Sequence, residues 1–240
     1  MITRRAVPGD VGTVRRICRR IYPRGDYVED ALGSWIRAGS LYVAEEGKMR
    51  GIFALHIEGD AAWLHGARVD PGFQGMGHGT AMYLAAEGLA RGAARMRAFA
   101  APRGSRILEK LGYRRISSVG AFVAGDGAEP SWDGFSGPEY DPGISVMDSW
   151  MMVRGGMALS LGSLSVSLAR SRFTSGVSLT LLRGDPADLW GYVAPRIDAR
   201  GKAAYRWWTR LEVLCAGPDP GLARAGFQDV GRYALYEKAI

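Results

Sequence analysis

The sequence feature that most constrains the fold of this chain is a glycine-rich turn between an apolar stretch and an Ala/Leu-rich stretch. Residues 61–69 have the composition of a β-strand, and residues 80–92 have the spacing of an amphipathic helix. Between them, Gly75, Gly77 and Gly79 stand at alternating positions. Because glycine has no Cβ, successive N–H groups can turn toward one point, and the helix start adds its own free N–H groups. The segment therefore predicts a binding site for an anion such as a pyrophosphate.

The spacing of the glycines excludes two common kinds of phosphate-binding loop. Neither the G-x-G-x-x-G of dinucleotide-binding folds nor the G-x-x-x-x-G-K-[ST] of P-loop proteins is present. The sequence has Gln74-Gly-Met-Gly-His-Gly79, preceded by Val69-Asp-Pro71 and followed later by Leu108-Glu-Lys-Leu-Gly-Tyr113. This set resembles the GCN5-related N-acetyltransferase (GNAT) family, whose loop has the pattern Q/R-x-x-G-x-G/A. The resemblance covers residues 1–123.

The resemblance implies a fold and a co-substrate. The fold would be α/β (α+β), with a GNAT-type mixed central sheet flanked by helices. The loop would hold the pyrophosphate of acetyl-coenzyme A (acetyl-CoA), and the backbone near Val69 would contact its pantetheine and thioester. The residues expected to bind acetyl-CoA are Ala67, Arg68, Val69, Gln74, Gly75, Met76, Gly77, His78, Gly79 and Thr80.

The strand before the loop also supplies a candidate catalytic residue, His65. Strict alternation would place Trp63, His65, Ala67 and Val69 on one face of this strand. Relatives in the family often carry a glutamate on that face, and His65 takes its place here. An unperturbed imidazole titrates near ~6.5, so it can accept a proton from an amine at neutral pH. The alternative is a partly buried histidine that is satisfied by a hydrogen bond.

One departure from the family leaves the function open. The tyrosine often proposed as general acid toward the departing thiolate would fall at Leu108, which has no proton to give. The favoured function is an N-acetyltransferase that moves the acetyl group directly to a primary amine of a small molecule or peptide. The alternative is a weak or inactive GNAT-like protein that binds coenzyme A as a sensor or a structural module.

The chain divides by composition into three parts. Residues 1–124 form the expected GNAT domain. Residues 125–148 hold Gly, Pro, Ser and six acidic residues but no basic ones, and we expect a linker or long loop there. Residues 149–240 are expected to form a C-terminal α/β domain. Within the first domain the pattern predicts helices over 11–22, 28–38, 80–92 and 106–111, and strands over 41–45, 49–57, 61–69, 96–101 and 118–123.

Two segments of the C-terminal part are similar in sequence to segments of the N-terminal domain. Residues 210–218 resemble 95–102, and 222–227 resemble 108–113, which suggests an internal duplication. Strands are expected over 150–166 and 177–183, with a helix opening at Asp185-Pro186. The second copy lacks a Q-x-x-G-x-G segment, so it would be a degenerate GNAT-like unit without a coenzyme site.

Composition excludes several other functions. The net charge is +7, but the arginines are scattered and form no clustered, aromatic-interleaved stripe, so a nucleic-acid partner is not expected. No apolar run approaches the ~20 residues of a membrane span. The two cysteines have no metal-ligand spacing and fit a reducing compartment. The expectation is a cytoplasmic protein with an amine substrate, no metal and no membrane; the oligomeric state stays open.

Overall fold

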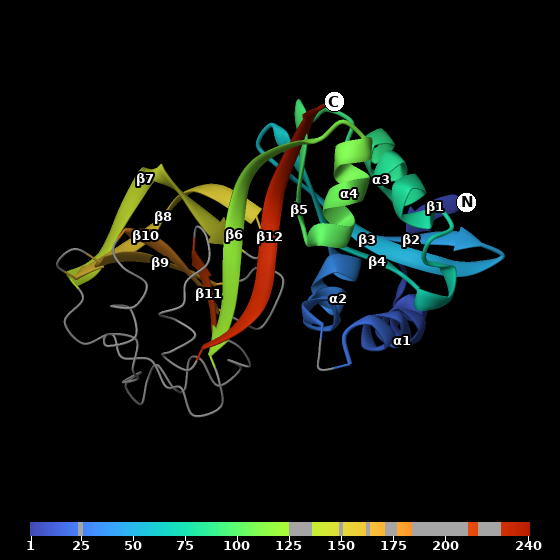
Figure 1. The fold of residues 1–240 in the computed structure, drawn as a ribbon, viewed down its shortest axis with the longest axis horizontal. Coiled ribbons are helices and arrows are strands. Elements are labelled where there is room, and N and C mark those ends of the chain that lie inside the picture. Colours follow the sequence, from blue (N-terminus) through green and yellow to red (C-terminus); the bar gives the residue numbers. More distant parts are fainter. Residues whose placement is uncertain are drawn as a thin grey trace. The chain divides into compact units, whose positions relative to one another are not determined.

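The computed structural model describes residues 1–23, 26–124, 136–148, 151–161, 164–170, 177–183, 211–215 and 227–240. The chain separates into two compact units (Figure 1). Unit 1 comprises Met1–Ser117 together with Ala234–Ile240, and unit 2 comprises Ser118–Tyr233.

Unit 1 is built on the mixed sheet that the sequence predicts. Its described strands are β1 (Ile2–Arg5), β2 (Leu41–Glu46), β3 (Lys48–Glu58), β4 (Ala61–Val69), β5 (Arg95–Ala100) and the end of β12 (Phe227–Ala239). They lie in the order β1-β2-β3-β4-β5-β12. Neighbours are antiparallel except β4 and β5, which run parallel. A parallel pair needs a crossover connection, and helix α3 (His78–Leu89) provides it.

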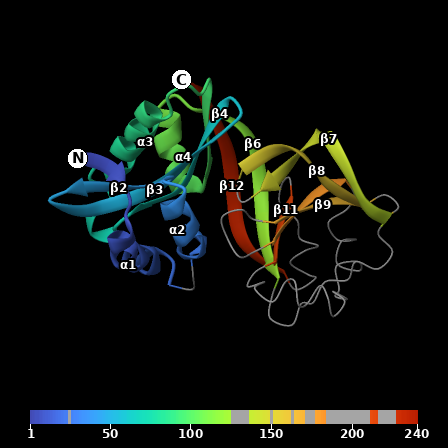
Figure 2. The same ribbon diagram turned by 180° about the vertical axis from the view of Figure 1, so that it is seen from behind.

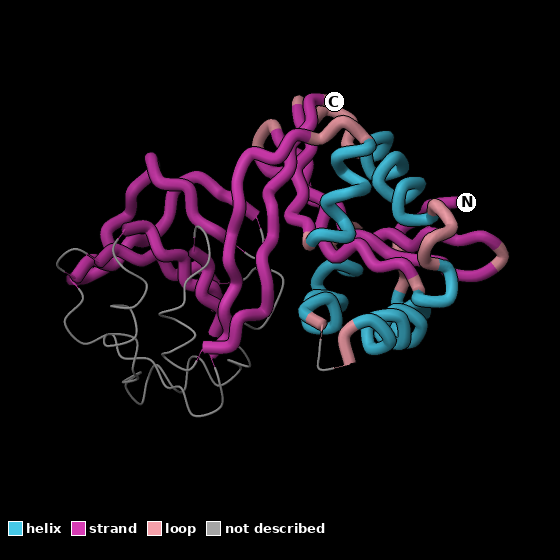
Figure 3. The backbone as a smooth tube through the Cα atoms, in the orientation of Figure 1, coloured by secondary structure: helices cyan, strands magenta, loops and turns pink. Residues whose placement is uncertain are grey.

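Helices cover both faces of this sheet, as Figures 1, 2 and 3 show. Helices α1 (Val11–Ile21) and α2 (Tyr27–Arg37) contact strands β2 to β4 on one face. Helices α3 and α4 (Pro102–Lys110) pack on the other. Two short 3₁₀ turns, η1 (Pro8–Asp10) and η2 (Pro71–Phe73), precede α1 and α3. Each helix predicted within residues 1–124 is present, shifted by a few residues at its ends.

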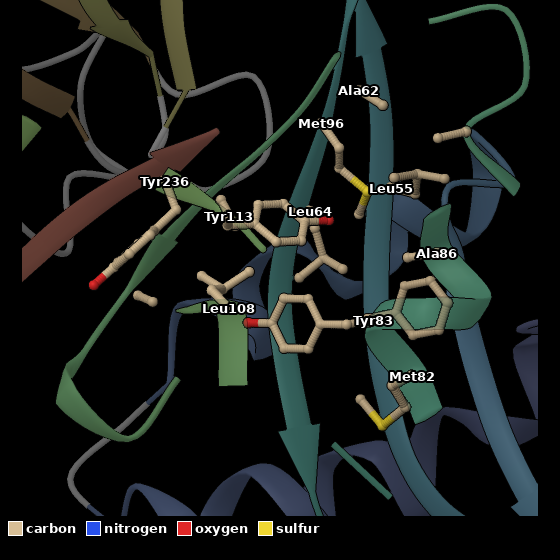
Figure 4. Packing of buried hydrophobic residues seen from close by; sticks show 14 of the residues in the cluster. Leu55, Ala62, Leu64, Met82, Tyr83, Ala86, Met96, Leu108, Tyr113 and Tyr236 are labelled. Carbon is tan, nitrogen blue, oxygen red and sulfur yellow. The ribbon is translucent and has the colours of Figure 1, made fainter. Parts of the chain in front are cut away.

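The core of unit 1 lies between the sheet and the helices α3 and α4. Strand residues such as Leu55, Leu64 and Met96 pack against Met82 of α3 and Leu108 of α4 (Figure 4). All five are fully or almost fully buried. Burial of one such side chain contributes about 1.5–3 kcal/mol, so this cluster holds α3 rigidly against β4. The loop at the start of α3 is thereby fixed to the end of β4.

The last strand of the sheet comes from the far end of the sequence. Residues Ala234 to Ala239 of β12 pair with β5. Tyr236 Oη donates a hydrogen bond to Glu109 Oε1 of α4 (2.6 Å), and Lys238 Nζ binds Glu87 of α3 (2.9 Å). The C-terminal segment therefore completes the sheet that carries the N-terminal site.

Unit 2 repeats the strand pairing of unit 1. Its described strands are β6 (Arg114–Ala124), β7 (Ser136–Asp148), β8 (Met151–Leu161), β9 (Leu164–Arg170), β10 (Val177–Arg183) and β11 (Leu211–Cys215). They follow the order β7-β8-β9-β10-β11-β6, again with one parallel pair, β10 and β11, in fourth and fifth place. The strand in sixth place, β6, follows α4 of unit 1 in sequence. The two halves thus share a topology and exchange their last strands.

Part of the region expected to be a loop is a strand. Residues 136–148 form β7, although they contain Pro138 and Pro142. The register of β7 with β8 shifts between Ser136 and Glu139 and again between Asp141 and Ser145, so both prolines fall in irregularities of the ladder. Proline is tolerated at bulges and on edge strands, and β7 is the edge of this sheet. The expected strand over 150–166 is a pair, β8 and β9, and the helix expected at 185–186 lies outside the described residues.

Candidate functional site

Strand β4 carries a bulge at Gly66, just before the predicted coenzyme loop. Its register with β3 shifts between the pairs Ala54–His65 and Ile52–Arg68, so β4 has one residue more than its partner. Gly66 has φ +55°, and a Cβ at this position would lie 3.0 Å from side-chain atoms of Trp35 and Val28. Glycine alone fits both the backbone conformation and the space.

The bulge corrects one prediction about the site. Leu64, Ala67 and Val69 all pack on the core side, against α3 and α4. His65 and Arg68 contact residues of α1 and α2 on the opposite side. The expected shared face of His65, Ala67 and Val69 is therefore wrong, because the extra residue at Gly66 reverses the alternation beyond it.

The ladder between β4 and β5 stops early. Paired residues run from Ala61–Arg95 to Leu64–Ala98, whereas β4 itself continues to Val69. On its other edge β4 stays paired with β3 as far as Val69. The backbone of β4 beyond Leu64 therefore has no ladder partner on the β5 side among the described residues. It can accept a ligand there through main-chain hydrogen bonds.

A buried aspartate shapes the turn that follows β4. Asp70 Oδ1 accepts hydrogen bonds from the Gly72 N–H (2.9 Å) and from Arg20 Nη1 (2.6 Å). The Asp70 N–H donates to the carbonyl of Arg50 (2.8 Å). These contacts direct the chain through η2 toward the glycine loop.

The glycine loop has the geometry of an anion cradle. Gly75 and Gly77 have φ of +81° and +83°, and a Cβ at either position would meet nothing within 4 Å. Gly77 is the N-cap of α3 and supplies no side-chain cap, so His78, Gly79 and Thr80 form an uncapped first turn. Left-handed glycines beside an uncapped helix start direct N–H groups and the helix dipole at one point.

The residues of the loop differ in their surroundings: some are exposed to solvent and others pack against neighbouring residues. Met76 is 66% exposed, and the rings of His78 and Phe73 are perpendicular, with their centres 6.1 Å apart. At Gly79 a Cβ would lie 3.0 Å from Ile107 Cδ1, so this glycine lets α3 approach α4.

Gln74 links the loop to α4. Its Nε2 donates to the carbonyl of Val69 (3.1 Å), and its Oε1 accepts from Arg103 Nη1 (2.9 Å). Two further cations lie over the Phe73 ring, with Lys48 at 4.9 Å and Arg50 at 3.9 Å from its centre. The loop is therefore surrounded by positive charge, which suits a phosphate-bearing ligand.

His65 lies inside the protein, 4% exposed, in a cluster of aromatic rings. Its ring centre is 6.4 Å from that of Trp35, 5.3 Å from that of His56 and 6.3 Å from that of Trp63. Burial, and secondly the charge of His56, lower the pKa of His65 well below its ordinary value of 6.5. The imidazole is neutral at pH 7, and its role as a base stays a prediction.

Leu108 occupies a structural position. It is fully buried, and Figure 4 shows it beside the ring of Tyr83. Burial raises the pKa of Tyr83 to about 12, so that hydroxyl stays protonated at neutral pH.

The described part of the chain offers neither a metal site nor a membrane-spanning helix. Its His, Cys, Asp and Glu residues form no group of three or more that could hold a metal ion. Its helices are all too short or too polar to cross a membrane.

Comparison with known proteins agrees with this geometry. Residues 13–113 match the profile of the Acetyltransferase (GNAT) family. A GCN5-related N-acetyltransferase from Sphaerobacter thermophilus is 15% identical, with 99% of this chain and 95% of that chain covered and a TM-score of 0.61. A tandem GNAT protein from the clavulanic acid biosynthesis pathway is 13% identical, with 99% and 98% covered and a TM-score of 0.55.

At these identities the structural likeness establishes the fold over both halves and nothing about substrates. No curated protein matches the sequence. The glycine loop, the early end of the β4–β5 ladder and the profile match converge on one assignment: residues 13–113 form an acetyltransferase domain of the GNAT family.

Proposed function

We propose that this protein is an N-acetyltransferase that moves the acetyl group of acetyl-CoA directly to a primary amine of a small molecule or peptide. The observation that carries the proposal is the start of α3, where Gly77 adopts φ +83° and leaves the first helical turn uncapped. The space around Gly75 and Gly77 is open, so a pyrophosphate can approach the backbone closely. The residues present therefore fit this co-substrate.

Each part of the site has a distinct task in this reaction. The N–H groups from Gly75 to Thr80 would hold the pyrophosphate, and Arg103 would add positive charge to it. The backbone of Ala67 to Val69 would hold the pantetheine arm and the thioester along the unpaired edge of β4. Holding the thioester against the amine converts an encounter into a positioned reaction, which is the largest contribution available here.

The transfer itself needs one proton acceptor. The amine nitrogen forms a bond to the acetyl carbon while the carbon–sulfur bond breaks, and the nitrogen loses a proton. We assign that proton to His65 through a water, because the imidazole is neutral at pH 7. A direct transfer is not expected, since His65 is buried on the face of β4 opposite to Ala67 and Val69.

The second candidate is a coenzyme A-binding protein with little activity. The observation that favours it is Leu108, which is buried in the core and cannot donate a proton to the thiolate. Both candidates bind coenzyme A, and the enzyme alone releases free thiol when amines are offered.

The test uses Met76, whose exposed side chain lies in the loop between Gly75 and Gly77. Coenzyme A at about 100 times its Kd should stabilise the parent by about 2.7 kcal/mol. Met76→Glu should reduce this shift, because it places a negative charge beside the pyrophosphate. Met76→Gln, of the same size, should retain it. Thermal unfolding measures binding, and a thiol assay across a panel of amines measures transfer; equal shifts in all three proteins would refute the site.

A further inference from the structure

Asp26 and Tyr27, at the start of α2, hold strand β4 at Gly66 and at Arg68. Tyr27 Oη accepts a hydrogen bond from the Gly66 N–H at 3.0 Å. Two residues further along β4, Arg68 donates to Asp26 through Nε and Nη2, each at 2.8 Å. Asp26 and Tyr27 are adjacent in sequence, so one short segment holds Gly66 and Arg68 and brackets Ala67.

The contacts that Asp26 makes with Arg68 are buried and have a defined geometry. The side chain of Asp26 is 1% exposed and that of Arg68 is 12% exposed. Asp26 Oδ1 also accepts the Val28 N–H at 3.1 Å as the N-cap of α2, which fixes the carboxylate in place. The guanidinium of Arg68 lies over the rings of Tyr22 and Tyr27, at 4.7 and 5.5 Å. A bidentate pair in such surroundings resists rotation of either partner.

The backbone that this segment holds needs such support. A bulge at a glycine can shift along a strand, because glycine adopts many conformations, and each shift by one residue reverses the side chains beyond it. On the β5 side the strand has no ladder partner past Leu64 among the described residues. Pairing with β3 holds one edge of this segment, and the contacts of Asp26 and Tyr27 add a second constraint on the orientation of Ala67 and Val69.

We propose that Asp26 and Tyr27 are positioning residues, which lock the Gly66 bulge and so hold the backbone of Ala67–Val69 ready for the coenzyme. The inference rests on the proposed function for the identity of the ligand. Without the lock, the segment would have to be ordered at the moment of binding, and affinity would fall. Neither residue needs to touch the coenzyme.

The decisive variant is Tyr27→Phe, which removes one hydroxyl and keeps the ring over Arg68. The loss of a single net hydrogen bond should weaken coenzyme A binding by about 3- to 10-fold. The matched control is Tyr22→Phe, because Tyr22 also faces Arg68 but is 44% exposed and does not hold Gly66. Titration calorimetry with coenzyme A measures the affinity of all three proteins.

Kinetics separate positioning from simple loss of folded protein. A positioning role predicts a raised KM for acetyl-CoA in Tyr27→Phe with kcat at saturation close to the parent. Partial unfolding would instead lower kcat and leave KM unchanged. An unchanged coenzyme affinity, or a fall in kcat alone, would overturn the proposal.

A coenzyme-free measurement keeps the inference distinct from the proposed function. Amide hydrogen exchange of the unliganded protein should be faster from Gly66 to Val69 in Tyr27→Phe than in the parent and in Tyr22→Phe. If the parent binds no coenzyme A, the proposed function fails, and exchange alone decides the lock. Unchanged exchange over this segment would refute it.

Discussion

Acidification should destabilise this protein through His65, and the size of the effect follows from its burial. The folded state holds the imidazole in its neutral form, since burial and then the charge of His56 lower its pKa well below 6.5. In the unfolded chain the same group titrates near its ordinary value. Between these two pKa values the unfolded state binds one proton more, so the free energy of unfolding falls as the pH falls.

The expected slope is about 1.4 kcal/mol per pH unit within that window, and there is no slope from this group above about pH 7. A fall from pH 6.5 to pH 5 therefore removes up to about 2 kcal/mol from the parent. For a chain of this length that corresponds to a fall in Tm of about 4–8 °C.

The assay compares thermal unfolding of the parent with that of His65→Gln between pH 5 and pH 8. Glutamine does not titrate, so its own effect on stability is independent of pH. Groups that do not interact with His65 cancel in the difference, and a matched His56→Gln background removes the contribution of His56, whose ring centre lies 5.3 Å away. The difference between the two proteins should shrink below pH 6.5 by the amount given above. His78→Gln is the control, because His78 is half-buried at the start of α3 and lies outside the core. Parallel pH profiles for the parent and His65→Gln would refute the reasoning.

Three further outcomes are expected. His65→Ala should lower turnover by roughly 10²–10⁴-fold with little change in coenzyme A affinity. In the parent, the acidic limb of the plot of rate against pH should lie well below pH 6.5. Turnover as fast as that of the parent would exclude His65 as the base. Titration calorimetry should give one coenzyme A per chain, since the second half has no Q-x-x-G-x-G segment, and two sites of similar affinity would contradict this. Deletion of residues 234–240 should abolish cooperative unfolding of unit 1, because it removes the strand that pairs with β5. Deletion of Ile240 alone should leave the transition intact. Calorimetry measures both variants, and a retained transition in the variant without residues 234–240 would contradict the prediction.

Local patterns were sufficient to predict most of unit 1. Strand β4 occupies the residues that the apolar pattern indicated, and α3 begins two residues earlier than expected, because Gly77 ends the turn in a left-handed conformation. Strand β7 was not predicted, because its two prolines indicated a loop. Only its pairing with β8 shows that the prolines lie at irregularities of the edge strand of the sheet.

The site was predictable where it depends on neighbouring residues. The glycine loop follows from spacing alone, because positive φ is a local property. The bulge at Gly66 had a signal that strict alternation ignored, namely an isolated glycine within a strand. The partnership of Arg68 with Asp26 had none, because the two residues are 42 positions apart and only the folded sheet brings them together.

The exchange of terminal strands has a consequence for how the protein is made. The segment that closes the edge of β5 is synthesised only after all of Ser118–Tyr233 has been translated. At about 5–20 residues per second this takes roughly 6–23 s, much longer than the folding of a small domain. During that time the nascent unit 1 presents an open strand edge at β5, which is a template for wrong pairing. The yield of native protein should therefore depend on the speed of translation through the second half and on chaperones that shield β5.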